Sequence, residues 1–436
     1  MTDVIIFFVQ QILLQGALFL GIFGAVGAIL ARKSTLEVFE TFVKTAAGIA
    51  ILSAGASLLV GAFNPLGALM IQVFGFEGLI VWNIPSWNYG LTLVPPDFPV
   101  NVALAAMLTL FLGFVLNLLA ARFTPVRTIY LTPHMMNHMA TAEVVAIAYY
   151  LPDIGFMSIV AIASIAVAAQ WIILPEISRR LSTKYWIPDG AYTVGHCLEA
   201  TAAVLGKTAQ ALGGKPEDSI EKRKVPDSLR AIADYIVISM IIALGMFVTV
   251  ALIAGPELVP SGTTHYLIWA VVQSINFTGG VVVMITGIQM FIGSMMPAFK
   301  GISERLIPGA IMAYDVPIIF PLGPRALTIG AATALVVQPL ITVTMGIMGF
   351  PVVPIPNAIS IFFHGAADGI YGDKMAGWKG AIFVSALGCA AEFLLAAIVV
   401  YPLTGPLYGK GFTWMGPDSN IFYAIWWGFL KLITGR

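Results

Sequence analysis

The sequence predicts an all-α, polytopic membrane protein with about eleven transmembrane helices and two re-entrant hairpins. The first observation is the composition, because 59% of the 436 residues are apolar and only 10% are charged, with a mean hydropathy of +0.92. A soluble chain carries roughly a quarter of charged residues, so these values exclude an ordinary soluble enzyme. The second observation is the distribution of charge, since long segments lack lysine and arginine and leave room for membrane-spanning helices.

The ionisable residues and the cysteines exclude further classes of protein. The 22 lysines and arginines balance 22 aspartates and glutamates, so no excess of positive charge is present to bind a nucleic acid. Cys197 and Cys389 are the only cysteines, and they cannot build a disulfide framework. We therefore expect a single integral membrane domain over residues 1–436.

The apolar spans are placed between the clusters of basic residues. Because backbone polar groups must be paired inside a bilayer, each span is expected to be a helix of about 20 residues. The first one has no basic segment before it and no cleavage site of small residues, so it is not expected to be a signal peptide. The expected helices are Ile5–Leu30, Thr45–Phe63, Val102–Ala120, Ile129–Tyr150, Ile154–Leu174, Ala231–Ala254, Leu267–Met296, Leu306–Leu322, Leu327–Met348, Ala381–Leu403 and Ile421–Ile433.

Basic residues set the expected orientation. Arg32 and Lys33, Arg122 and Arg127, Arg179 and Arg180, and the loop 206–230 all fall on one side of this scheme, which the positive-inside rule makes cytoplasmic. An odd number of crossings then places the N-terminus outside and the C-terminus in the cytoplasm. Arg325 falls on the outside and is the exception.

Two apolar segments are too short and too polar for a clean crossing. Residues 189–205 lie between Lys184 and Lys207, and residues 353–370 are followed by Lys374 and Lys379, all of which the scheme places in the cytoplasm. Neither segment has room for two helices. We expect re-entrant hairpins, which are tolerated in a bilayer where protein buries them or where they line a watery cavity. Leu306–Gly323 is a third interrupted element, because prolines and glycines surround Asp315.

Histidines and acids inside these segments are the candidate site residues. Four of the five histidines, His134, His138, His196 and His364, fall in interrupted or re-entrant elements. Imidazole both donates and accepts hydrogen bonds, so such a cluster suits a polyhydroxylated ligand, a proton relay or a metal. Their spacings match no dedicated zinc pattern beyond one pair four residues apart, so we expect no metal and no other cofactor.

Acidic residues in these segments are candidates for a similar reason. Insertion of a carboxylate at the bilayer centre costs roughly 2.5 to 3.5 kcal/mol, so such a residue needs a partner or a function. Asp315 in its broken segment favours a functional role. Asp368 and Glu199 leave a functional and a structural role open, whereas Glu392 on a long apolar helix favours a buried structural hydrogen bond. Cys197, beside His196, is either a ligand or an inert buried thiol.

Several segments resemble the ascorbate-type IIC permeases of the bacterial phosphoenolpyruvate:sugar phosphotransferase system. The most specific is FKGISERLIPGAIMAYD, Phe299 to Asp315. The others are ILARKS (29–34), RTIYLTPHMM (127–136), TVGHCLEA (193–200), IPNAISIFF (355–363) and GDKMAGWKGAI (372–382). The resemblance runs in the same order over almost the whole chain, and the galactitol-type IIC proteins are more distant relatives.

That resemblance implies a homodimer in the bacterial inner membrane, with a V-shaped scaffold domain and a core domain that moves as an elevator. It implies that separate cytosolic IIA and IIB proteins phosphorylate the substrate as it emerges, and that this chain carries no phosphorylated residue. Gly55, His134, His196 and Asp315 match the family's ligand-contacting positions.

Other positions depart from that family and bear on the substrate. His138 and Cys197 stand where the family has glutamines, and His364 and Asp368 replace uncharged residues. Unpaired polar groups of a substrate cost binding energy, so an ascorbate-like sugar or sugar acid is expected without its exact identity. The candidate substrate-binding residues are Gly55, His134, His138, His196, Cys197, Asp315, His364 and Asp368.

Two other functions remain open at this point. The first is a proton-coupled carrier of a hydroxylated solute on the same fold, with His138, His364 and Asp368 as protonation sites. The second is a membrane-embedded, metal-dependent enzyme that uses the histidines. Coupling to phosphoenolpyruvate and IIB separates the carrier from the permease, and elemental analysis tests the enzyme.

Overall fold

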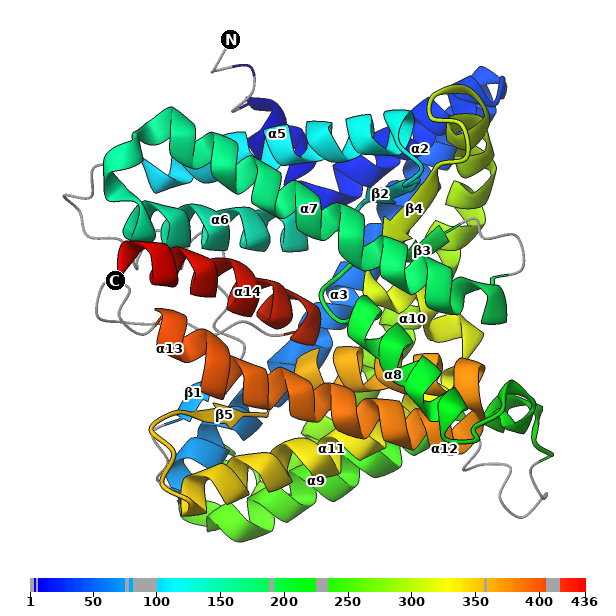
Figure 1. Cartoon of the computed structure of the whole chain (residues 1–436). Coiled ribbons are helices and arrows are strands. Elements are labelled where there is room, and N and C mark those ends of the chain that lie inside the picture. Colours follow the sequence, from blue (N-terminus) through cyan, green and yellow to red (C-terminus); the bar gives the residue numbers. More distant parts are fainter. Residues whose placement is uncertain are drawn as a thin grey trace.

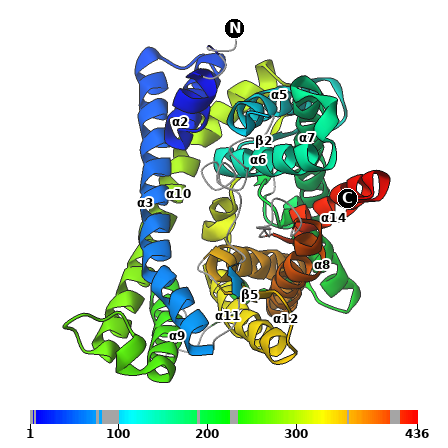
Figure 2. The ribbon, with the colours of Figure 1, turned by 90° about the vertical axis from the view of Figure 1, so that its left-hand side faces the viewer.

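The computed structural model describes residues 4, 7–74, 78–80, 100–187, 192–224, 234–356, 359–404 and 416–436. The chain is mainly helical, and its elements lie in two blocks that face each other (Figures 1 and 2). Within the described residues, seven helices are long and apolar enough to cross a membrane. The expected polytopic helical architecture is confirmed at this level, while the count of about eleven crossings stays a prediction.

The first block contains the longest helices, which run along one side of the molecule (Figure 2). Helix α2 is Gly16–Leu30 after a π-helical turn at Val9–Leu13, α3 is Thr35–Phe74, α9 is Tyr235–Leu258 and α10 is Tyr266–Arg305. These four helices contact one another in sequence-distant pairs, above all α3 with α10.

Glycines bring α3 and α10 into backbone contact. A Cβ added to Gly55 would lie 2.4 Å from the backbone nitrogen of Met284, and one added to Gly287 would lie 2.4 Å from that of Leu52. Small residues at such positions permit the close helix packing that is typical of membrane bundles.

The second block is built from helices around a small buried sheet. Its members are α5 (Val102–Phe123), α6 (Pro133–Tyr150), α7 (Phe156–Ser182), α8 (Glu199–Ala211), α11 (Pro324–Ile347), α12 (Gly365–Leu394), α13 (Tyr401–Thr404) and α14 (Pro417–Thr434). Short 3₁₀ and π-helical segments connect them, at Pro152–Ile154, Thr183–Tyr185, Pro216–Asp218, Ile220–Lys222, Val316–Leu322, Ile359–His364 and Leu395–Val400.

Three short strands form the sheet, in the order β2 (Thr128–Tyr130), β4 (Ile311–Tyr314) and β3 (Tyr192–Val194). Both pairings are parallel, and β4 is central. Backbone pairing in a ladder satisfies polar groups that could not stay bare in hydrocarbon. A second pair, β1 (Gly78–Ile80) with β5 (Val353–Ile355), is also parallel.

The sheet corrects the expected helix Leu306–Leu322. That segment is β4 followed by the 3₁₀ helix Val316–Leu322, and no α-helix forms there. Gly309 adopts a φ of 73°, and prolines at three positions remove the backbone donors that an α-helix would need. The sheet also shortens the expected helix Ile129–Tyr150, because the first residues of that segment belong to β2.

Arg325 does not lie on the opposite side from the basic loop, as the sequence-based scheme has it. Its backbone nitrogen donates to Glu221, and its guanidinium donates to the carbonyl oxygen of Arg223. These partners belong to the basic loop 206–230, of which residues 225–230 lie outside the described part of the chain. The chain therefore enters the molecule along β4 and returns to the end at which it entered. Arg325 lies at that end together with the basic loop, so it is not an exception to the distribution of positive charge.

The two expected hairpins fold differently from each other. In 189–205, whose first three residues are outside the described chain, β3 leads in and α8 leads back. In 353–370, where residues 357 and 358 are not described, β5 leads through a π-helical turn into α12. That helix continues to a kink at Gly377, which packs on Lys215 and Asp218 of the basic loop. This second segment therefore passes to the opposite end of the molecule from β5 and does not form a hairpin.

The last helix places the C-terminus differently from the sequence-based scheme. Helix α14 begins beside the turn before α8, where the nitrogen of Asp418 donates to the carbonyl of Cys197. It ends where Arg436 donates to the carbonyl of Tyr149, and the neighbouring Tyr150 hydroxyl donates to the carbonyl of Leu403. The C-terminus thus lies at the same end as Leu403, because α14 starts inside the molecule and runs back.

Candidate functional site

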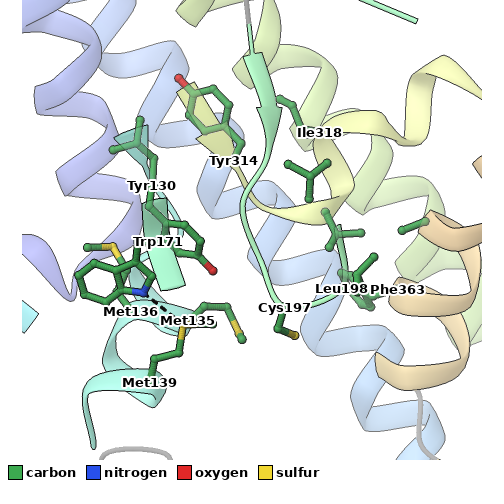
Figure 3. Close-up of a cluster of buried hydrophobic side chains, with 14 of the residues drawn as sticks. Tyr130, Met135, Met136, Met139, Trp171, Cys197, Leu198, Tyr314, Ile318 and Phe363 are labelled. Atoms are coloured by element: carbon green, nitrogen blue, oxygen red, sulfur yellow. Dashed lines mark hydrogen bonds between the residues drawn. The ribbon is translucent and has the colours of Figure 1, made fainter. Parts of the chain in front are cut away.

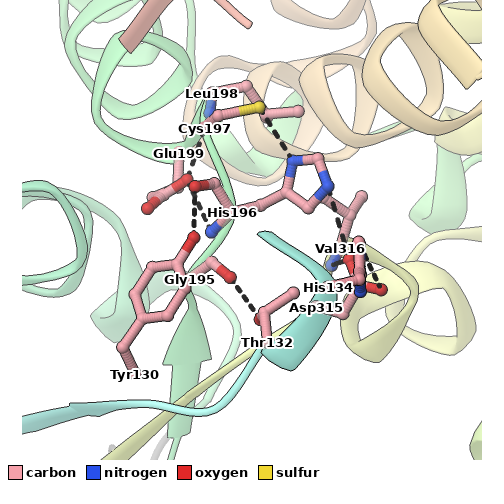
Figure 4. A network of polar contacts seen from close by, with 10 residues as sticks. All are labelled: Tyr130, Thr132, His134, Gly195, His196, Cys197, Leu198, Glu199, Asp315 and Val316. Carbon is pink, nitrogen blue, oxygen red and sulfur yellow. Dashed lines mark hydrogen bonds and ion pairs between the residues drawn. The ribbon is translucent and has the colours of Figure 1, made fainter. Parts of the chain in front are cut away.

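The carboxyl ends of the three parallel strands meet at one edge of the buried sheet and carry the candidate site. Helix α6 follows β2 and places His134 in its first turn, the turn after β3 carries His196, and Asp315 follows β4 (Figure 4). Because all three strands run in the same direction, residues that directly follow them gather at one place. These residues are far apart in the sequence, and only the pairing of the strands joins them.

The carboxylate of Asp315 lies between the two imidazoles. Nε2 of His196 is 3.7 Å from one carboxylate oxygen, and Nε2 of His134 is 3.8 Å from the other. The side chain of His196 is 5% exposed, whereas those of Asp315 and His134 are 27% and 52% exposed. Asp315 also accepts a hydrogen bond of 2.7 Å from the nitrogen of Val316, which fixes its orientation at the start of the 3₁₀ helix.

A cavity of about 270 Å³ opens in front of His134 and Asp315. Its other walls come from α2, α3 and α10 of the first block, so both blocks contribute to it. The lining residues are Leu14, Gly16, Ala17, Leu20, Ile49, Leu52, Ser53, Leu131, Thr132, Pro133, His134, Ile288, Phe291, Tyr314 and Asp315. A mostly apolar wall with a few convergent polar groups is the usual form of a small-molecule site.

Hydrogen bonds between strands hold the His196 turn in place. The Tyr130 hydroxyl donates to the carbonyl of His196, and the Thr132 hydroxyl donates to the carbonyl of Gly195 at 2.5 Å. Glu199 accepts from the nitrogen atoms of His196 and Leu198, both at 3.1 Å. Neither Tyr130 nor Thr132 was predicted as a site residue, although both lie in the RTIYLTPHMM segment.

Apolar packing supports the same turn from behind. Tyr130 stacks on Trp171 with ring centroids 5.8 Å apart, and the Trp171 indole nitrogen lies 3.1 Å from the sulfur of Met139 (Figure 3). All three side chains are fully buried. A close-packed interior transmits small displacements, so β2 and the His196 turn are expected to move together.

Helix α14 also contributes to the site. The two carboxylate oxygens of Asp418 accept hydrogen bonds of 2.7 Å from the nitrogen atoms of Ala200 and Thr201, in the first turn of α8. Those donors are the groups that a helix leaves unpaired at its N-terminus. No pattern in the sequence indicated this contact, since Asp418 lies 218 and 217 residues along the chain from the two donors.

Most of the predicted site residues are neighbours, but they do not share one cavity. His134 and His196 have ring centroids 5.9 Å apart, and His196 and His364 are 5.3 Å apart. Cys197 lies behind His196, with its sulfur 3.1 Å from Nδ1 of that ring. His138 is one helical turn deeper than His134, at 6.1 Å between ring centroids.

Gly55 lies apart from this group, and Asp368, one turn after His364, does not line the cavity. Gly55 sits in the contact between α3 and α10 and faces Met284, while Ser53 on the same helix lines the cavity. Asp368 is buried against Gly388 within α12. Its helix also carries Glu392, whose carboxylate accepts from His364 at 3.0 Å, so the predicted structural hydrogen bond of Glu392 is present.

The arrangement suits the binding of hydroxyl groups. Two imidazoles and one carboxylate offer both donors and acceptors at a site that is partly open. Among the described residues, two triads of side chains also bring metal-ligating atoms within 4.8 Å of one another, namely His134, His196 and Asp315, and His196, Cys197 and His364. His196 belongs to both.

Comparison with known proteins agrees with these features. The family model described as the sugar-specific permease component of the PTS system matches residues 11–419. The ascorbate-specific PTS system EIIC component of Mycoplasma pneumoniae is 25% identical over 438 residues, which cover 88% of this chain and 65% of that protein. The chain therefore spans about 65% of the length of the curated relative that it matches.

Proposed function

This chain belongs to the family of sugar-specific permease components of the phosphotransferase system, and we propose that it is the IIC component that takes up an ascorbate-like sugar acid. One observation carries this proposal. His134, His196 and Asp315 converge at the carboxyl ends of three parallel strands, in front of a cavity of about 270 Å³. The similarity to an ascorbate-specific relative supports the substrate class.

In this proposal the substrate bridges the three side chains. The distances of 3.7 and 3.8 Å between imidazole and carboxylate are longer than hydrogen bonds, so a hydroxyl oxygen can sit between them. A ring that carries several hydroxyl groups would donate to Asp315 and accept from the imidazoles. The partly exposed His134 would contact substrate first, and the buried His196 would complete the site.

The division into two blocks supports an elevator mechanism. Helices α2, α3, α9 and α10 contact one another closely through glycines, and we assign them to the scaffold. The sheet, α6 and the turn before α8 carry the site. We assign them to the moving core together with α8, α11 and α12, in which α12 contacts both other helices. A homodimer in the bacterial inner membrane completes the proposal, with the basic loop 206–230 facing cytosolic IIB and IIA proteins.

Reconstituted transport tests this function. Proteoliposomes that contain the purified chain would receive labelled L-ascorbate outside, and IIB, IIA, the general phosphotransferase proteins and phosphoenolpyruvate inside. We expect phosphorylated product to accumulate, and uptake to stop when either phosphoenolpyruvate or IIB is omitted. Accumulation of unmodified substrate without them would refute the coupling, and uptake of another sugar acid in place of ascorbate would change only the substrate.

One observation favours a second candidate, a proton-coupled carrier of a hydroxylated solute. His364 and Glu392 form a buried contact of 3.0 Å, and Asp368 is buried one turn along the same helix. Together with His138 these groups could exchange protons during transport. In that case uptake would follow an imposed pH gradient, and Asp368→Asn would uncouple it. Transport that ignores the gradient excludes this candidate.

A further inference from the structure

We propose that His196, Cys197 and His364 form a binding site for a zinc ion behind the substrate cavity. The possible ligand atoms of these three residues lie within 4.8 Å of one another, and all three residues are buried. The site goes beyond the transport function, because none of its three residues is among those that line the cavity. Sequence spacing did not predict it, since His364 ends the π-helical turn before α12 and the other two residues lie in the turn before α8.

Glu392 orients His364 as a metal ligand. Its carboxylate accepts from Nδ1 of His364 at 3.0 Å, so Nδ1 carries the proton and Nε2 keeps a free electron pair. That Nε2 atom is fully buried and has no hydrogen-bond partner among the described residues. Metal-binding histidines typically donate their other N–H to a carboxylate in this way. A buried polar atom without a partner is costly, and a metal ion would satisfy it.

His196 and Cys197 complete the set of ligands. Nε2 of His196 faces Asp315 at 3.7 Å, which favours a proton on Nε2 and leaves the electron pair of Nδ1 directed to the other side. There Nδ1 lies 3.1 Å from the sulfur of Cys197. In Figure 4 the His196 ring stands between this sulfur and Asp315. The contact of Asp418 with the Cys197 carbonyl, at 2.9 Å, fixes the backbone of the turn.

The chemistry of the donors indicates which ion would bind. One thiolate and two imidazoles are ligands that zinc and cuprous ions prefer, whereas magnesium and calcium prefer oxygen. Zinc bonds of about 2.0 to 2.3 Å in tetrahedral geometry place donors roughly 3.3 to 3.8 Å apart, which small side-chain rotations can reach from the present positions. The thiolate and the Glu392 carboxylate together offset two positive charges, as a divalent ion requires in a region of low dielectric constant.

Cobalt substitution tests the site in the purified, full-length protein. Co²⁺ added to metal-free wild-type protein should produce a thiolate-to-cobalt charge-transfer band and a tetrahedral visible spectrum, and Zn²⁺ should displace both at one equivalent per protomer. This measurement uses the wild-type protein, so it does not depend on whether any variant folds. Absence of the charge-transfer band, or spectra typical of six oxygen or nitrogen ligands, would overturn the proposal.

Matched variants assign the ligands. Cys197→Ser should lose the charge-transfer band, and Cys389→Ser should keep it, because Cys389 is equally buried but belongs to no such triad among the described residues. His364→Gln should lose zinc, and Glu392→Gln should bind it about 10- to 100-fold more weakly. His134→Ala should retain zinc, since it removes only the other triad. An intact band in Cys197→Ser, or loss of zinc in His134→Ala, would contradict this assignment.

Discussion

Nε2 of His196 lies 3.7 Å from a carboxylate oxygen of Asp315, although the two residues follow separate strands of the buried sheet. The second oxygen faces His134 at a similar distance. The carboxylate therefore has an imidazole on each side and a cavity in front of it. A gap of this length leaves room for one bridging oxygen, so the arrangement is suited to a ligand that inserts a hydroxyl group.

Replacing Asp315 tests this arrangement most directly. Asp315→Asn keeps the shape of the side chain but removes its charge, and a hydrogen bond to a charged group contributes about 1.5 to 3 kcal/mol. We expect the Kd for the transported sugar acid to rise about 10- to 150-fold, measured by isothermal titration calorimetry, with an unchanged melting temperature. The control is Asp153→Asn at an exposed turn. Unaltered affinity in Asp315→Asn would move the substrate site elsewhere.

Tyr130 is a positioning residue for the His196 turn. Tyr130→Phe removes the hydroxyl that donates to the His196 carbonyl and keeps the stacking on Trp171. Since a hydrogen bond contributes about 0.5 to 1.5 kcal/mol, we expect substrate affinity to fall about 2- to 12-fold. Tyr266→Phe, at the start of α10, serves as the control for loss of a hydroxyl. If Tyr130→Phe lowers only the melting temperature and not the affinity, its role is purely structural.

Gly55 provides a test that separates packing from substrate contact. An added Cβ would lie 2.4 Å from the Met284 nitrogen, whereas one at Gly61 of the same helix has nothing within 4 Å. Overpacking costs about 1 to 3 kcal/mol, so Gly55→Ala should lower the melting temperature, while Gly61→Ala should leave it equal or raise it. A stable Gly55→Ala protein that loses only substrate binding would restore the direct contact implied by the family resemblance.

The position of the C-terminus is testable by chemical labelling. The variants Arg436→Cys, Asp153→Cys and Lys33→Cys, each of which adds one cysteine, would be exposed to a membrane-impermeant maleimide in oriented vesicles. Both native cysteines are buried and can remain. Because Arg436 contacts Tyr149 near the turn between α6 and α7, we expect positions 436 and 153 to react from one side and position 33 from the other. Reaction of positions 436 and 33 from the same side would support the orientation predicted from the sequence.

Much of the fold could be predicted, because a segment that crosses a bilayer must be apolar and must pair its own backbone polar groups. The charge-free segments around α3, α5, α7, α9, α10 and α11 predicted helices that the structure contains. The strands could not be found in this way. Each has only three or four residues, too few for an alternating pattern, and each pairs with a segment far along the chain. The prolines and glycines around Asp315 were the only sequence feature that indicated an interrupted helix in that segment.

The same limit applied to the candidate site. His134, His196 and Asp315 were singled out because ionisable groups are scarce in this chain and costly in a bilayer. Their mutual positions, the support from Tyr130 and Asp418, and the contact between His364 and Glu392 could not be predicted, since each joins elements that no local pattern links. Gly55 was selected by resemblance, and the structure shows its packing contact.

By itself, the sequence determined that this chain is a helical membrane protein of the sugar-specific permease family, and it identified the residue types that carry chemistry. Composition and charge suffice for the membrane class, because transfer into a bilayer depends on each segment separately, whereas the family rests on the resemblance of several sequence segments. Only the tertiary structure decided that Leu306–Leu322 enters the molecule and returns to the same end. It also decided that α14 runs from the interior back to the end near Leu403, and which side chains share a cavity. These outcomes depend on pairing and packing between distant segments, so no single segment contains them.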